Sequence, residues 1–97
     1  MAEQRKEDEA QPLLEEPVPI KDILMMTILS LETKAWSYLG LIAHPETKKQ
    51  KKDLNEAKLA IDSIEVLFKL MESILTNEEK RDIQVRLTNL RLNFVKE

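Results

Sequence analysis

His44 is the only histidine of the chain, and it stands next to Pro45 and two residues before Glu46. An imidazole could act as a general acid or base, but catalysis needs a nucleophile or an orienting carboxylate held beside it. Glu46 is close only because it belongs to the same turn. We therefore interpret His44 as a solvated loop residue beside a proline that stops the preceding helix.

Metal and phosphate sites are also not indicated. The chain has no cysteine and a single glycine, so it offers no thiolate ligands and no glycine-rich phosphate loop. Asp62, Glu65 and Glu72 follow helical spacing and are interpreted as a solvated helix face rather than as cation ligands. The sequence therefore predicts no catalytic residue, no metal and no cofactor, and a protein that is not an enzyme.

The strongest local charge signal is the segment 48–52, KKQKK, which we call the basic loop. Such a cluster could contact RNA, DNA or an anionic membrane surface. Against this, the net charge of the chain is -3, and no aromatic residues alternate with the lysines for base stacking. Nucleic acid is not the partner we expect. A weak nucleic-acid or ribonucleoprotein accessory is kept as the alternative function, with these contacts: Lys48, Lys49, Lys51 and Lys52, with Arg86 and Arg91.

The elements that position these residues begin after an acidic segment. Residues 1–16 hold six acids and two bases, a net charge of -4, so the remainder carries about +1 of the total of -3. A polar, aperiodic segment of this kind cannot bury enough apolar surface to offset its ordering entropy. We predict a disordered acidic tail over residues 1–18 and a single helical domain over residues 19–97. A short docking motif at Leu13-Leu14 is the functional alternative.

The location expected from the sequence is cytoplasmic. Acidic residues stand where the positive region of a signal peptide would be. The apolar run 23–31 has about half the length needed to cross a bilayer. The absence of cysteine permits a reducing compartment. We therefore expect no membrane contact.

Three helices are predicted, over about 20–43, 54–75 and 77–95. The first starts after Pro17-Val18-Pro19 and stops before Pro45, because proline is accepted in a first turn and disfavours helix at the residue before it. Gly40 falls inside this helix, where glycine is unfavourable unless a neighbouring backbone comes close. One glycine and few β-branched or aromatic residues leave little material for strands, so the predicted fold is all-α.

The second and third predicted helices carry start signals and a clear apolar pattern. Asp53 with Glu56, and Thr76 with Glu79, have the spacing of capping boxes. The second helix then shows a heptad of apolar residues: Leu54, Ala57, Ile61, Ile64, Phe68, Met71 and Leu75. The short link to the third helix implies an antiparallel hairpin. We expect a three-helix bundle with the first helix packed on this hairpin.

The first helix is apolar over more of its circumference than a helix covered on one side requires. Two explanations stay open: both other helices cover it, or part of it meets a second copy of the chain. Small domains often gain burial by oligomerising, and two-fold dimers are the commonest oligomers. We favour a homodimer and keep another protein as a further partner. The predicted interaction surface is Met25, Leu29, Trp36 and Tyr38.

The segments Ser30–Thr47, SLETKAWSYLGLIAHPET, and Leu54–Leu67, LNEAKLAIDSIEVL, resemble a family of short bacterial proteins described as a domain of unknown function, number eighteen forty-four. The residues that carry the resemblance are Ser30-Leu31, Ala35, Leu39 to Ile42, Pro45 to Thr47, Leu54, Ala57, Ile61-Asp62, Thr76, Glu78-Glu79 and Leu90-Arg91. The chain departs from the family in residues 70–75, which lack its glycine, and in Phe94, where the family has tyrosine. The resemblance implies a bacterial helical protein and brings no known activity.

Overall fold

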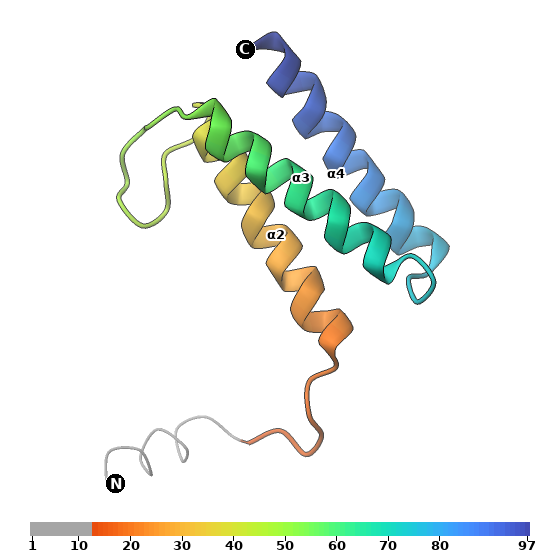
Figure 1. The fold of residues 1–97 in the computed structure, drawn as a ribbon. Helices are drawn as coiled ribbons and strands as arrows, with labels where there is room; N and C mark the ends of the chain where they lie inside the picture. The colour runs from red at the N-terminus through yellow and green to blue at the C-terminus, as the bar shows by residue number, and fades with distance from the viewer. Residues whose placement is uncertain (1–12) are drawn as a thin grey trace, which may run out of the picture.

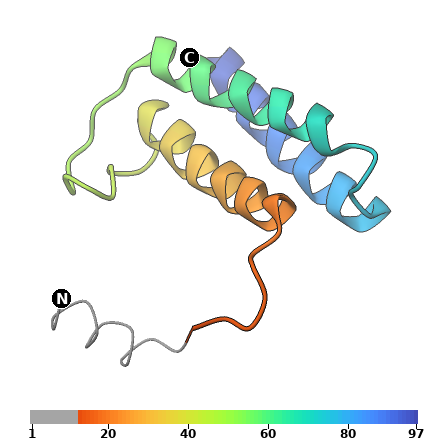
Figure 2. The same cartoon turned by 60° about the horizontal axis from the view of Figure 1, so that its bottom comes forward.

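The computed structural model describes residues 13–97, and this part of the chain contains three α-helices and no strand. They are α2 (Ile20–Tyr38), α3 (Leu54–Met71) and α4 (Asn77–Lys96), labelled in Figure 1. α2 and α4 run in the same general direction, with α3 returning between them (Figures 1 and 2). α2 packs mainly on α3 and less on α4. The predicted all-α three-helix bundle is confirmed.

The core is formed by the inner faces of all three helices. The heptad predicted for the second helix faces inward, with Ile61, Ile64 and Met71 buried. The other buried apolar side chains are Ile28, Ala35, Leu39, Ala57, Ala60, Phe68, Leu75, Ile83, Leu87 and Leu90. Apolar burial of this kind is the main favourable term in folding such a domain.

α2 ends at Tyr38, five residues before the end predicted from Pro45. Gly40 has a φ of 84°, its N–H donates to the Ser37 carbonyl at 3.0 Å, and the Leu41 N–H donates to the Trp36 carbonyl at 3.1 Å. This pair of bonds is a Schellman motif, in which a left-handed residue closes the helix. The prediction that the helix extends to residue 43 was therefore wrong, because Gly40 ends it.

α3 begins as predicted, with Asp53 accepting hydrogen bonds from the N–H groups of Asn55 and Glu56 at 3.1 and 3.2 Å. The expected reciprocal bond, from the Asp53 N–H to the Glu56 carboxylate, is absent, because this N–H donates to the Tyr38 carbonyl at 2.8 Å. That bond ties the start of α3 to the end of α2.

The end of α3 lies at Met71 rather than residue 75. The Met71 carbonyl accepts from the N–H groups of both Ile74 and Leu75, so the chain tightens into a turn there. Leu75 nevertheless stays in the core, as the heptad predicted. Thr76 and Glu79 then form the predicted capping box at the start of α4.

Ion pairs join the helices at the edges of the core. Two connect α2 to α4 and one connects α3 to α4: Lys21–Glu79 at 2.9 Å, Glu32–Arg86 at 2.6 Å and Glu65–Arg91 at 2.5 Å. Hydrogen bonds to Asp82, which has the larger effect, and to Glu32 raise the pKa of the Arg86 guanidinium. Within residues 13–97, no helix is both long enough and apolar enough to cross a membrane.

Candidate functional site

His44, the candidate general acid or base of the sequence, lies at the centre of a polar cluster and is only 4% exposed. Its Nδ1 lies 2.6 Å from the Lys34 Nζ, and its Nε2 lies 2.8 Å from the Lys51 carbonyl oxygen. Because a lysine ammonium can only donate, Nδ1 accepts, and the ring proton sits on Nε2 and is donated to Lys51. The Tyr38 ring packs edge-on against the imidazole with 4.5 Å between centroids.

Lys34 links this imidazole to a carboxylate. Its ammonium donates to the Glu46 Oε2 at 2.6 Å and lies 4.9 Å from the centroid of the Tyr38 ring. The hydrogen bond from Lys34 lowers the pKa of the Glu46 carboxyl below its ordinary value. We call Lys34, Tyr38, His44 and Glu46 the His44 cluster.

The His44 cluster holds the loop between α2 and α3. The His44 N–H donates to the Lys49 carbonyl, and its own carbonyl accepts from the N–H groups of Thr47 and Lys48. His44 is thus buried, and the interpretation as a solvated residue was wrong, because contacts from α2 and from the far end of the loop enclose it. Both ring nitrogens are engaged, so neither is available to take a proton from a substrate.

The basic loop is only partly available for an anion. The Lys52 side chain pairs with Glu97 and packs beside Gly40. His44 holds only the backbone carbonyl of Lys51, whose side chain is exposed. Lys48 adopts a φ of 59°, and it and Lys49 are exposed. Arg86 and Arg91, the other residues of the nucleic-acid alternative, are engaged in the ion pairs with Glu32 and Glu65.

The four residues of the predicted interaction surface lie in different surroundings. Met25, Trp36 and Tyr38 are partly buried and pack against the core, and Tyr38 belongs to the His44 cluster. Leu29 is 47% exposed. The structure therefore leaves Leu29 as the most accessible of the four.

Leu29 belongs to a broader exposed surface, which we call the outward face of α2. Met26, 65% exposed, and Ile23 are its other apolar members. Its exposed polar members are Thr27, Ser30 and Thr33. No charged residue stands between Asp22 and Glu32. Ile23 and Met26 were not among the predicted surface residues, although their spacing of three with Leu29 and the lack of charge could have indicated them.

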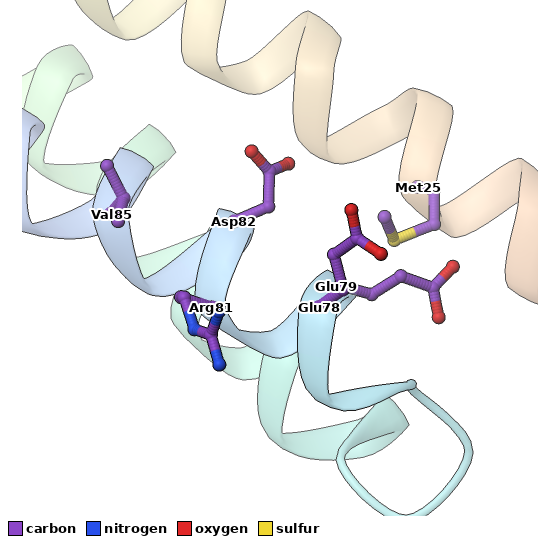
Figure 3. A pocket seen from close by; sticks show the side chains of 6 residues that line it. All are labelled: Met25, Glu78, Glu79, Arg81, Asp82 and Val85. Atoms are coloured by element: carbon purple, nitrogen blue, oxygen red, sulfur yellow. The ribbon is translucent and has the colours of Figure 1, made fainter.

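Met25 lines a groove of about 470 Å³ between α2 and the start of α4. Figure 3 shows Met25 on α2 facing the α4 residues Glu79 and Asp82, with Val85 farther along α4. Glu79 and Asp82 already pair with Lys21 and Arg86. Among residues 13–97, no three His, Asp or Glu side chains converge to hold a metal ion.

Residues 21–96 match the family model described as "Domain of unknown function (DUF1844)". The match covers most of the chain, so the protein belongs to this family, as the sequence resemblance predicted. No curated protein and no solved structure matches the chain.

Proposed function

We propose that this protein is a non-enzymatic interaction module of the bacterial cytoplasm that acts by self-association, and that the outward face of α2 is its contact surface. The observation that carries the proposal is an exposed helix face with apolar residues and no charge. An apolar stripe on a helix normally packs against another surface. In the single chain, α3 and α4 cover only one side of α2.

Two of the three hydroxyl groups of this face, those of Thr27 and Thr33, would be buried at little cost. The Thr27 hydroxyl donates to the Ile23 carbonyl at 2.9 Å, and the Thr33 hydroxyl donates to the Leu29 carbonyl at 3.2 Å. Since both donors already have partners within the helix, covering them leaves no hydrogen bond unmade. The methyl groups of the two threonines add to the apolar surface.

A second copy of the chain is the occupant that fits this face. A partner that placed a charged group here would desolvate that charge without a counterion, which is unfavourable. Another α2 supplies an uncharged surface of the same kind. Ile23, Met26 and Leu29 form a ridge at spacing three. A two-fold axis through Met26 would place Ile23 of each copy beside Leu29 of the other.

The absence of catalysis is part of this proposal, supported by the full engagement of both His44 ring nitrogens. Contact with nucleic acid through the basic loop remains the alternative function. It is supported only by exposed lysines, whose binding would depend strongly on salt.

Light scattering on a size-exclusion column, over a dilution series of the full chain, tests the proposal. Met26→Glu should halve the molar mass, because the carboxylate would have to be buried in the contact. Gln84→Glu, which adds the same charge at an exposed position of α4, is the control and should keep the wild-type mass. Equal masses for Met26→Glu and wild type would refute self-association through this face.

A further inference from the structure

A second apolar row runs along α3, on the side away from the core. Leu59, Val66 and Leu70 are 64%, 58% and 71% exposed, and Ser63 lies between the first two. The spacings of four, three and four residues are those of a coiled-coil seam. We call Leu59, Ser63, Val66 and Leu70 the outer stripe of α3. The Ser63 hydroxyl donates to the Leu59 carbonyl at 2.7 Å, so its polar atom already has a partner.

We propose that the outer stripe packs antiparallel against the outer stripe of a second copy, around a two-fold axis between Ser63 and Val66. In this register Leu59 of each copy lies opposite Leu70 of the other, and Ser63 lies opposite Val66. All four layers then pair residues of the stripe with each other. No exposed leucine is left without an apolar neighbour.

The charges beside the stripe select this orientation. Asp62 and Lys69 occupy the same flank, at equivalent heptad positions. In the antiparallel pair, Asp62 of one copy lies beside Lys69 of the other. The two-fold symmetry produces this contact twice. Opposite charges at such flanking positions favour one orientation of a helix pair. A parallel pair would instead place Asp62 beside the other flank, which holds Leu67, and would leave Lys69 beside the end of α3 at Met71.

The surface next to the stripe provides a place for the incoming leucine. A groove of about 380 Å³ lies between α2 and α3 and is lined by these residues: Leu31, Lys34 and Tyr38 of α2, and Glu56, Leu59, Ala60 and Ser63 of α3. In the proposed register, Leu70 of the second copy projects toward this groove. The partner helix would therefore contact α2 as well as α3.

This contact uses a different helix face from the outward face of α2, so it does not rest on the proposed function. Asp62 bonds to Lys58, and Lys69 pairs with Glu65, within a single chain at exposed positions. Such exposed pairs contribute little to stability, so Asp62 and Lys69 can also pair with the charges of a second copy.

The mass of the full chain again provides the first test. Val66→Glu should halve the molar mass, while Leu92→Glu, at a position of α4 with 56% exposure, should leave it unchanged. Circular dichroism should show wild-type helix content for both variants, because both side chains are exposed. A wild-type mass for Val66→Glu would overturn the proposal. Since Met26→Glu probes the other face, the two contacts succeed or fail separately.

Cross-linking tests the register, and the chain is suited to it because it has no cysteine. Ser63→Cys and Val66→Cys chains, distinguished by different tags, should form a mixed disulfide when oxidised together. Each variant alone should cross-link at least several-fold less, because like residues are offset along the axis. Cross-linking in the mixture no greater than in the separate variants would overturn the antiparallel register.

Exchange of the two flanking charges tests the charge pairing. Asp62→Lys or Lys69→Asp alone should lower the molar mass, and the two changes together in one chain should restore it. Failure of the double variant to restore the mass would count against the charge pairing.

Discussion

Replacing His44 by alanine removes a buried side chain that joins α2 to the loop before α3. Three contacts disappear: the bond accepted from Lys34, the bond donated to the Lys51 carbonyl and the packing on Tyr38. A typical hydrogen bond contributes about 1 kcal/mol, and more when one partner is charged. An edge-on aromatic pair contributes about 1 kcal/mol. The sum is a loss of about 3 kcal/mol in the free energy of unfolding.

Urea titration measures this loss, with helix content followed by circular dichroism and the core followed by the fluorescence of Trp36, the only tryptophan. A domain of this size has a total stability on the order of 5–15 kcal/mol. The midpoint should therefore fall clearly, with little change in the slope. A shift in melting temperature of roughly 15 °C is expected, since each kcal/mol corresponds to several degrees in a small domain.

Glu46→Gln is the matched control, because it changes the exposed end of the same network. It should alter stability much less than His44→Ala, since exposed ion pairs contribute little. The reasoning is refuted if His44→Ala costs less than about 0.5 kcal/mol, which is the range of an ordinary surface substitution. It is also refuted if the two variants are destabilised equally.

Three other changes give further tests. Gly40→Ala should lower stability by about 1 kcal/mol in urea titration, because a left-handed φ disfavours a Cβ, whereas Gly40→Asn should cost less. Thr76→Ala should cost about 1 kcal/mol through loss of the cap. Hydrogen bonds from Lys21 and from the Thr76 N–H lower the pKa of Glu79 in the folded chain. Its contribution to the free energy of unfolding is therefore present above the ordinary pKa of 4.5 and is lost as the pH falls through the lower folded pKa. Glu79→Gln should make the stability depend less on pH in acid. In a filter-binding assay, we expect wild-type retention of nucleic acid to depend hardly at all on salt concentration, and replacement of all four lysines of the basic loop by serine to leave it unchanged. Wild-type binding that falls steeply with salt, and that the replacement abolishes, would favour the alternative function instead.

Signals that act within one turn of chain could be predicted well. Asp53 and Thr76 cap their helices because each side chain reaches N–H groups two or three residues ahead. The inward heptad of α3 followed from its spacing alone. The end of α2 was mispredicted because two stop signals compete there. Gly40 precedes Pro45 along the chain, and the first residue able to close the helix does so.

The surroundings of His44 could not be predicted in the same way. Its partners Lys34 and Lys51 lie ten and seven residues away, and they meet only when the loop folds back on α2. The lost bond between Glu56 and Asp53 has the same origin, since the donor is taken by Tyr38. The outward face of α2 and the outer stripe of α3 could be predicted in part. Their spacing is visible in the sequence, but only the packed helices show which apolar row is covered.

The two proposed contacts together determine what assembly the chain can form. The outward face of α2 and the outer stripe of α3 would each join two copies around a two-fold axis. Two different two-fold contacts produce a closed set of four chains when their axes meet at right angles, a larger closed ring when they meet at another whole fraction of 180°, and an open chain of copies when the axes do not meet. With both contacts, the closed assembly has four times the chain mass, each single glutamate variant has twice that mass, and the double variant is a monomer. A wild-type mass that rises steadily with concentration would instead identify the open arrangement. A wild-type dimer that only one of the two substitutions dissociates would assign self-association to that face and leave the other available for a different protein.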